Sequence, residues 1–352
     1  MKGMATATAT AAQATRGRLW FRALRAPFLV ASVLPVVLAG VFALLTYLKP
    51  CVVQFTRGGA PVWECGGALV TKQVAGYRYF LDFGLFNGWF FLLALVGAIC
   101  VHLATNMLND NFDFRSGDDL AVKHQNPFAG GSRVLPQGVL NVNAHLVVAL
   151  GFLAFGALIG LYLVTKVGLT LLWIGLVGVF VALFYVAPPF RLANRGVGEL
   201  FVGLSFGPLV VMGTYYVMTQ RLDWGPFFLA MSMGLLVAAI LWINEFPDVE
   251  ADLSVGKRTL MARLGYERSV DWYFYLVAGA YVFAGLGVIT ATVPWPVLVT
   301  FLTVPIAGKN LRHLQVHARD PMALIPANAG TVMLTLAFGI LAILGVLAGI
   351  VL

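Results

Sequence analysis

The sequence predicts an all-α membrane protein with about nine transmembrane helices. Of its 352 residues, 60% are hydrophobic and only 11% are charged, whereas about a quarter of the residues of a soluble domain are charged. Apolar runs close to the roughly 20 residues that cross a bilayer recur along the chain, and no alternating barrel pattern accompanies them. Because backbone polar groups in lipid must be satisfied within the segment, each run is expected to form a helix.

The expected spans follow one another with short connections. They cover residues 26–48, 84–108, 143–165, 168–187, 198–219, 226–246, 270–292, 294–309 and 326–352. Only the turn at Pro294 and Pro296 separates the seventh span from the eighth, because proline lacks the N–H that a continuing helix uses. We expect one transmembrane domain over residues 18–352, preceded by a disordered tail over residues 1–17.

The residues before the first span predict a helix at the membrane surface. The start, MKGMATATATAAQATRGRLW, has no apolar segment ahead of its basic residues, so we do not expect a cleaved signal peptide. The stretch RLWFRALRAPF then alternates basic and aromatic residues, which is typical of an interfacial helix. Such a helix would lie along the inner surface and lead into the first span.

The distribution of basic residues predicts a cytoplasmic N-terminus. With nine spans, seventeen of the 23 Lys and Arg residues fall on the side of the N-terminus, and the cytoplasmic side of a membrane protein carries this excess. The protein is therefore expected in the inner, cytoplasmic membrane with its C-terminus outside. A basic face beside anionic lipid explains the net charge of +8, so we infer no nucleic-acid partner, and no required protein partner is inferred either.

Two of the three cysteines lie in the first external loop, residues 50–80. An oxidising compartment would permit a disulfide between Cys51 and Cys65. Spacing alone does not set disulfide geometry, so a bridge and two free thiols remain alternatives. Cys100 is expected to be a small buried residue of the second span.

Acidic residues are concentrated after the second and the sixth spans, which end on the same side. The first stretch reads HLATNMLNDNFDFRSGDD. If the helix continues through it, Asn109 and Asp113 lie on one face, and Asn106 and Asp110 form a second pair. Gly117 would then let the chain turn, which would bring two further carboxylates back toward the site, those of Asp118 and Asp119.

The second acidic stretch reads LWINEFPDVEADLSVGKRTL. Asn244, Asp248 and Asp252 are spaced four residues apart, which places them on one helical face. Pro247 marks a kink or a restart of that helix. Charged groups beside hydrocarbon are costly, so the two stretches indicate a functional site rather than ordinary solvated loops.

Carboxylate and amide oxygens without histidine or cysteine favour a hard cation. Mg²⁺ fits best, because it keeps waters and bridges to the phosphates of a substrate. The acidic stretches also contain three basic residues that would donate directly to phosphate oxygens: Arg133, Lys257 and Arg258. The pattern therefore predicts Mg²⁺ together with a polyanion.

The two stretches resemble the motifs of a known family. NDNFDFRSGDD is similar to the first aspartate-rich motif of the UbiA superfamily of intramembrane prenyltransferases, and DVEADLSVGKRTLMARLG to the second. RAPFLVASVLPVVLAG and YVAPPFRLANRGVGELFVGLSFGPLVVMGTYYV resemble its 1,4-dihydroxy-2-naphthoate branch, which makes menaquinone precursors. The resemblance implies helices around a central cavity, with Mg²⁺ and an isoprenyl diphosphate between the motifs. It assigns the metal to Asn109, Asp113, Asp119, Asp248 and Asp252, and we expect Asn106, Asp110 and Asn244 to bind substrate.

Two segments depart from the family pattern. Asn111 stands where the family usually has tyrosine, and NPFAGGSRVLPQG replaces a more basic segment before the third span. Both are expected near the acceptor. The external loop is also longer than is usual in the family.

The implied activity is Mg²⁺-dependent transfer of a polyprenyl group from its diphosphate to an aromatic acceptor, with 1,4-dihydroxy-2-naphthoate favoured. Acceptors such as 4-hydroxybenzoate, haem, a chlorophyllide or a phosphoribose remain alternatives. A transporter is less favoured, because the motifs recur on the same side rather than in inverted repeats.

Aromatic and basic residues near the expected site have two interpretations each. Tyr185, with Phe180 and Phe184, would stabilise an allylic cation, or these rings would only pack. Arg191 and Arg195 would bind the acceptor carboxylate, or they would anchor their loop to anionic lipid.

Overall fold

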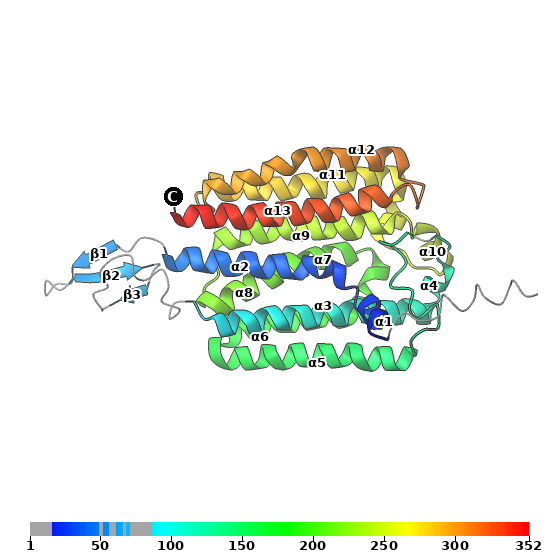
Figure 1. The fold of residues 1–352 in the computed structure, drawn as a ribbon, viewed down its shortest axis with the longest axis horizontal. Helices are drawn as coiled ribbons and strands as arrows, with labels where there is room; N and C mark the ends of the chain where they lie inside the picture. The colour runs from blue at the N-terminus through cyan, green and yellow to red at the C-terminus, as the bar shows by residue number, and fades with distance from the viewer. Residues whose placement is uncertain are drawn as a thin grey trace, which may run out of the picture.

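A bundle of long, apolar, roughly parallel helices forms the body of the protein (Figure 1). The computed structural model describes residues 16–48, 52–55, 61–65, 68–70, 86–124 and 126–351. Seven helical segments are long and apolar enough to cross a membrane. They correspond to α2 (Val30–Leu48), α3 (Gly88–Ser116), α5 (Val142–Val167), the segment Gly198–Thr219, α9 (Trp224–Glu245), α11 (Leu260–Ile289) and α13 (Ile325–Val351). The prediction of an all-α membrane protein is confirmed.

The expected fourth and eighth spans are helical but differ from the seven. The fourth corresponds to α6 (Leu169–Phe184), which has 16 residues. The eighth begins as a 3₁₀ helix, η5 (Trp295–Thr303), and continues as α12 (Val304–His317). A count of nine spans therefore remains a prediction.

Short elements occupy both ends of the bundle. At one end lie α1 (Arg16–Ala23), η1 (Ala26–Leu29), α4 (Asp118–Ala121), η3 (Leu192–Arg195) and α10 (Val249–Ser254). The opposite end carries a three-stranded antiparallel sheet made of β1 (Val52–Phe55), β2 (Pro61–Cys65) and β3 (Ala68–Val70). This sheet lies in the predicted external loop. Residues 1–15 of the predicted tail lie outside the described residues, and Arg16 already begins α1. Cys51 of the external loop also lies outside the described residues.

The segment between Gly198 and Thr219 changes its helical type midway. It comprises α7 (Gly198–Leu204), the π-helical turn η4 (Ser205–Leu209) and α8 (Val210–Thr219). Around this turn it packs closely on α9: a Cβ on Gly207 would lie 2.3 Å from the carbonyl oxygen of Ala230, and a Cβ on Gly234 would lie 2.3 Å from that of Gly203. Only glycine permits such a close approach of two helix backbones.

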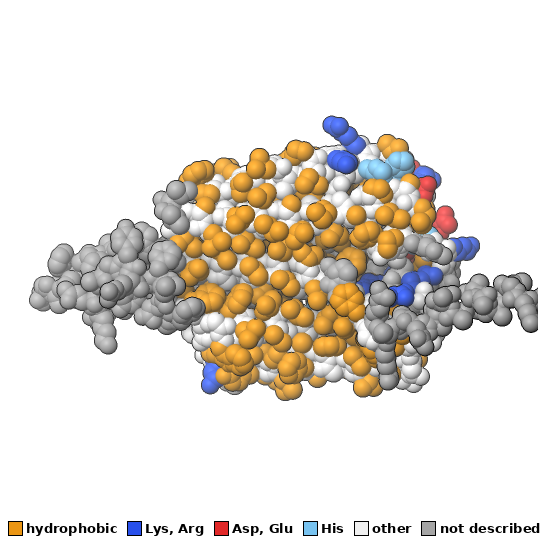
Figure 2. Space-filling view, in the orientation of Figure 1, with side chains coloured by type: hydrophobic (Ala, Val, Ile, Leu, Met, Phe, Trp, Pro, Cys, Tyr) orange, Lys and Arg blue, Asp and Glu red, His pale blue; other side chains and the backbone are white. Residues whose placement is uncertain are grey.

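The surface separates an apolar middle from a charged end. Hydrophobic side chains cover the face between the two ends, and most of the charged side chains on that face gather near the end with α4 and α10 (Figure 2). An apolar face of this extent suits a lipid environment. The protein is a multi-pass membrane protein, and its charged end contains both acidic motifs.

Candidate active site

The first acidic motif begins on the last turns of α3. The Asn109 amide donates a hydrogen bond of 2.9 Å to the Asp113 carboxylate, which confirms that these residues share one face. Gly117 ends the helix with a φ of 89°, a backbone conformation that glycine adopts without penalty. The chain therefore turns back at once into α4, and the carboxylates of Asp118 and Asp119 are buried.

The second motif spans a break between two helices. The sequence allowed either a kink or a restart of the helix at Pro247. The structure has a restart, because α9 ends at Glu245 and α10 begins at Val249. The backbone N–H of Asp252 bonds to the carbonyl of Asp248, so these two residues remain one helical turn apart. Asn244 belongs to α9, and its side-chain oxygen accepts a hydrogen bond from Asn328.

Lys257 joins the two motifs. Its Nζ lies 2.6 Å from a carboxylate oxygen of Asp118, 3.3 Å from Asp252 and 3.5 Å from Asp113. Burial alone would lower the pKa of Lys257, but the three carboxylates raise that pKa well above its ordinary value. We had expected Lys257 to donate to phosphate; in this structure it neutralises acid from both motifs.

A second basic residue enters the site from the N-terminal end of the chain. Arg25, between α1 and η1, places its guanidinium 3.0 Å from the buried carboxylate of Asp110. Burial lowers the pKa of Arg25, but Asp110 and the neighbouring aspartates outweigh this and raise it. On the far side of the site, His124 contacts Asp248 at 2.9 Å. The sequence analysis missed both residues as members of the site.

The side chains of this cluster fit a divalent cation with a diphosphate. Burial, followed by nearby carboxylates, raises the pKa of Asp119 to about 9. Burial, reinforced by Asp118 and Asp248 against the opposing effect of Lys257, raises that of Asp252 to about 8. One oxygen each of Asp118 and Asp119 is buried without a hydrogen-bond partner. Such an excess of buried acid calls for added positive charge.

Over the part of the chain that the structure describes, no three His, Cys, Asp or Glu side chains meet as a metal site. This arrangement still suits Mg²⁺, which usually takes one or two carboxylates and completes its octahedron with waters and substrate phosphates. The donor set consists of carboxylates and the Asn109 amide, which Mg²⁺ prefers.

Several other predicted residues lie around the cluster. The Asn106 amide nitrogen is buried and has no hydrogen-bond partner. Arg133 donates to the backbone carbonyls of Asp119 and Val122, so it holds α4 in place rather than pointing at an open site. The side chain of Arg258 is exposed beside the site.

The two arginines assigned to the acceptor lie at the surface. Arg191 and Arg195 are exposed, and Arg195 donates to the carbonyl of Pro189 at 3.1 Å. Their loop follows α6, at the same end of the bundle as α10. In this structure neither arginine belongs to the buried cluster.

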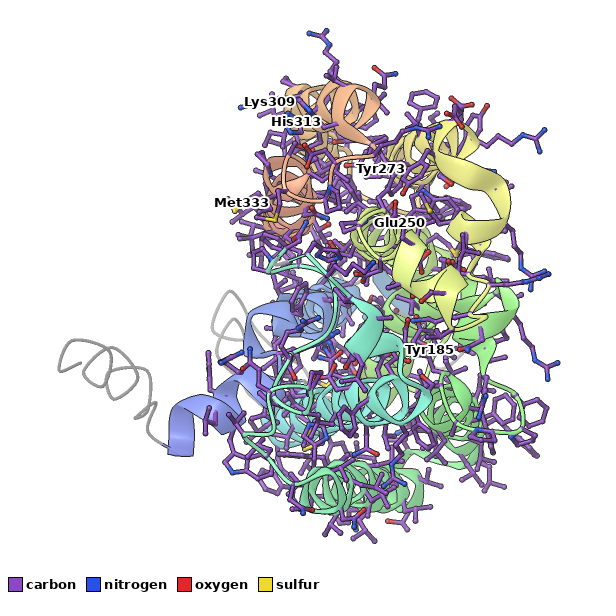
Figure 3. The ribbon with its side chains drawn as sticks, turned by 90° about the vertical axis from the view of Figure 1, so that its right-hand side faces the viewer. Tyr185, Glu250, Tyr273, Lys309, His313 and Met333 are labelled. Carbon is purple, nitrogen blue, oxygen red and sulfur yellow. The ribbon has the colours of Figure 1, made fainter. Side chains whose placement is uncertain are left out.

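Of the three aromatic candidates, only Tyr185 lies by the site. Tyr185, directly after α6, is 8% exposed and is seen from the charged end in Figure 3. Phe180 and Phe184 instead pack with Phe190, with ring centroids 5.0–5.2 Å apart. Phe180 is exposed. The packing interpretation therefore describes these two phenylalanines.

Asn111, which was expected near the acceptor, makes two contacts within the protein. It is fully buried, donates to the carbonyl of Val142 at the start of α5, and accepts a hydrogen bond from Arg115. Asn111 therefore fastens α3 to α5. The NPFAGGSRVLPQG segment, by contrast, contacts both acidic motifs through its backbone.

An apolar cavity of about 400 Å³ lies beside the cluster. Its walls come mainly from α3, α5, α6 and the α7–η4–α8 segment, with Ser32 of α2, and they include Thr105, one residue before Asn106, and Tyr185. The polar groups of His102 and Ser32 in its wall satisfy one another at 2.5 Å. An elongated apolar ligand with a charged head would place its head at the cluster and its tail in this cavity.

Comparisons with known proteins find relatives whose names describe prenyl or phytyl transfer. A 1,4-dihydroxy-2-naphthoate octaprenyltransferase of Mycobacterium tuberculosis is 31% identical over 74% of this chain and 85% of its own length. A 2-carboxy-1,4-naphthoquinone phytyltransferase of Synechocystis is 29% identical over 68% of this chain and 75% of its own.

Solved structures share the fold. A UbiA homolog from Aeropyrum pernix superimposes with a TM-score of 0.59 at 16% identity, covering 89% of this chain and 97% of that one. A homolog from Archaeoglobus fulgidus, bound to GPP and Mg²⁺, gives 0.51 at 15% identity, covering 92% and 99%. The model of the UbiA prenyltransferase family matches residues 74–323. The chain therefore belongs to the UbiA prenyltransferase family.

Proposed function

We propose that this prenyltransferase transfers a polyprenyl group from a polyprenyl diphosphate to 1,4-dihydroxy-2-naphthoate, a step of menaquinone biosynthesis. We place the enzyme in the cytoplasmic membrane with its charged end facing the cytoplasm. The observation that carries the proposal is the meeting of both acidic motifs around Lys257 beside an apolar cavity of about 400 Å³.

The charged cluster would hold the head of the donor. Its metal ligands are the residues assigned above, Asn109, Asp113, Asp119, Asp248 and Asp252. Bound Mg²⁺ would neutralise negative charge that develops on the leaving diphosphate. Lys257 and Arg25 already lie among these carboxylates, from where they can turn to phosphate oxygens once a divalent cation balances the acid.

The residues of the chain would promote departure of the diphosphate. As the allylic C–O bond breaks, its electron pair leaves with the diphosphate, and fixed positive charges stabilise that group in a site with little water. An electron-rich ring carbon of the acceptor then forms the new C–C bond, and the bond from that carbon to its former substituent breaks, so that a proton, or the carboxyl group as CO₂, leaves and the ring regains its aromaticity. Tyr185, which lines the cavity, would face the allylic cation with its ring.

The cavity would hold the part of the prenyl chain next to the diphosphate. Its walls are predominantly apolar side chains of four helical segments, so transfer of the chain from lipid costs little. A soluble enzyme would have to withdraw the whole chain from the membrane. The fold thus explains why the reaction takes place within the bilayer.

The choice of acceptor is supported by the relatives. Both relatives reported above have naphthalene-ring acceptors in their names. We retain Arg191 and Arg195 as candidate partners of the acceptor carboxylate, because they lie at the charged end and are exposed. Binding lipid phosphate remains their alternative role.

The test is product formation by the purified protein. The protein, Mg²⁺ and one labelled polyprenyl diphosphate are incubated with either 1,4-dihydroxy-2-naphthoate or 4-hydroxybenzoate. We expect a prenylated product from the naphthoate and none without Mg²⁺. Product from 4-hydroxybenzoate alone would reject the naphthoate assignment and keep the prenyltransferase. Arg191→Ala and Arg195→Ala should lower the affinity for the acceptor. Mg²⁺-dependent binding of the diphosphate should remain unchanged.

A further inference from the structure

The loop between α4 and α5 makes backbone contacts with both acidic motifs. The N–H of Gly130 donates to a carboxylate oxygen of Asp248 at 2.9 Å, and the N–H of Ser132 donates to Asp110 at 3.2 Å. Asp248 follows α9 and Asp110 is on α3, and the two are 138 residues apart in sequence. One tight turn therefore holds a carboxylate of each motif.

The turn can do this because its backbone is left-handed at three positions. Gly130, Gly131 and Arg133 have φ values of 69°, 69° and 62°. Left-handed residues on either side of Ser132 let backbone N–H groups of one short turn face different acceptors, as they do in anion-binding nests. A left-handed backbone is unfavourable for arginine, and the hydrogen bonds from the Arg133 guanidinium to the carbonyls of Asp119 and Val122 help to offset this cost.

The residue between the two donors lies within the site itself. A Cβ on Gly131 would lie 3.0 Å from Asp119 Oδ1, 3.1 Å from Arg25 Nη2 and 3.1 Å from Asp110 Oδ1. Asp119 is 4% exposed, and its second oxygen has no hydrogen-bond partner. The turn thus packs against two buried carboxylates of the cluster, and one of them, Asp119, keeps an oxygen without a hydrogen-bond partner.

We propose that the turn Gly130–Arg133 is the positioning element that sets the distance between the two motifs for a Mg²⁺–diphosphate. This rests on the function proposed above. Its N–H groups donate to the carboxylates of Asp110 and Asp248 and so fix their orientation, as hydrogen bonds from surrounding residues orient the ligands of a metal. Because carboxylate oxygens have more than one lone pair, each can keep its N–H bond while it binds a cation or its waters.

Gly131→Ala tests the proposal against a matched control, Gly138→Ala. Both glycines lie in the same loop, with φ values of 69° and 67°, but a Cβ on Gly138 meets nothing within 4 Å. Both variants therefore suffer similar backbone strain, and only Gly131→Ala places an atom among Asp110, Asp119 and Arg25. A difference in ligand binding between the two variants therefore arises from the added atom in the site and not from strain in the loop.

The readout is heat stability of the full-length protein in detergent during titration with inorganic pyrophosphate and Mg²⁺. A ligand that binds the folded state raises the melting temperature, and the rise grows with the logarithm of the ligand concentration relative to its Kd. For Gly131→Ala we expect the half-effective concentration to rise about 10-fold to 100-fold, as for lost outer-shell contacts. Gly138→Ala should stay close to the wild type, and equal weakening of both variants would overturn the proposal.

A second pair covers the case that Gly131→Ala fails to fold. Ser132→Pro removes the N–H that reaches Asp110, whereas Ser132→Ala keeps it. Proline requires a negative φ, and Ser132 is not among the residues with positive φ. Weaker pyrophosphate binding by the proline variant than by the alanine variant supports the proposal, and equal binding contradicts it. Transfer by the wild type is measured separately, so failure of the proposed function would be recognised independently.

Discussion

Two acidic residues of the same short helix, Asp252 and Glu250, differ in their surroundings. Asp252 is 2% exposed and lies 3.3 Å from Lys257, whereas Glu250 is exposed on the same helix, α10, at the charged end (Figure 3). Helical spacing explains the difference, because residues two positions apart point to different sides. Of these two residues, Asp252 is the one in contact with the cluster, and we propose that it acts on the ligand.

We predict that Asp252→Asn lowers the rate of prenyl transfer at least about 100-fold, the usual scale for removing one group that stabilises developing charge. The melting temperature should change little, because asparagine keeps the shape of the side chain and Lys257 retains Asp118 and Asp113. The measurement is transfer at saturating Mg²⁺ together with thermal unfolding. Glu250→Gln is the control and should remain active. A fully active Asp252→Asn would remove Asp252 from the metal ligands.

Residue spacing in the sequence predicted the local geometry well, but it predicted the partners of long side chains poorly. The pairing of Asn109 with Asp113 and the turn at Gly117 follow from helix periodicity and glycine conformation, and both are confirmed. The roles of Lys257 and Arg133 were less predictable. Flexible basic side chains bind whichever acceptor the fold brings close, and here these are the aspartates and two backbone carbonyls.

At the level of elements, the close packing of the α7–η4–α8 segment on α9 supports one wall of the cavity. Gly234 on α9 leaves no room for a side chain against Gly203 and Gly207, while Ser205 and Phe206 of the same segment line the cavity. A substitution that pushes this segment away from α9 should therefore change both stability and the shape of the cavity.

We predict that Gly234→Ala destabilises the protein by about 1–3 kcal/mol, the usual cost of overpacking, and lowers affinity for long-chain donors. The control is Gly151→Ala on α5, where a Cβ meets nothing within 4 Å. There, alanine should be neutral or stabilising by about 0.5–1 kcal/mol, because glycine is unfavourable inside a helix. Thermal unfolding of both variants is the measurement. A stable Gly234→Ala protein would show that the two helices can separate at little cost.

The helices themselves follow from the sequence more directly than the connections between them. Apolar length predicts α3, α5, α9 and α13, whereas the short α6 and the 3₁₀ start of η5 give weaker signals of the same kind. The loop at Gly130–Arg133 gave no such signal. Its contacts are made by backbone N–H groups to residues more than 20 positions away, and side-chain patterns do not encode them. Arg25 was likewise assigned to the membrane surface, because its charge suits both lipid phosphate and Asp110.

For the whole molecule, the two ends of the bundle should face different compartments. The charged end carries both motifs, and the other end carries the strands (Figures 1 and 2). The helix α11 is interrupted at Gly265, and its part from there to Ile289 runs between the ends. At a rise of about 1.5 Å per residue, this part still exceeds the roughly 30 Å of a hydrocarbon core. Positions just before and just after α11 therefore report on opposite sides of the membrane.

We predict that a cysteine at Ser254 lies on the cytoplasmic side and a cysteine at Ala291 on the opposite side. Both positions are exposed, one at the end of α10 and the other just after α11. The variants Ser254→Cys and Ala291→Cys are made in a background with Cys51 and Cys65 replaced by serine; the remaining Cys100 is buried.

A membrane-impermeant maleimide applied to intact cells should label Ala291→Cys at once and Ser254→Cys only after the membrane is opened. The physical reason is the excess of Lys and Arg on the side of the charged end, which resists translocation across the membrane. Labelling in the reverse order would invert the orientation. It would then require the donor diphosphate and the naphthoate to reach the cluster from outside the cell.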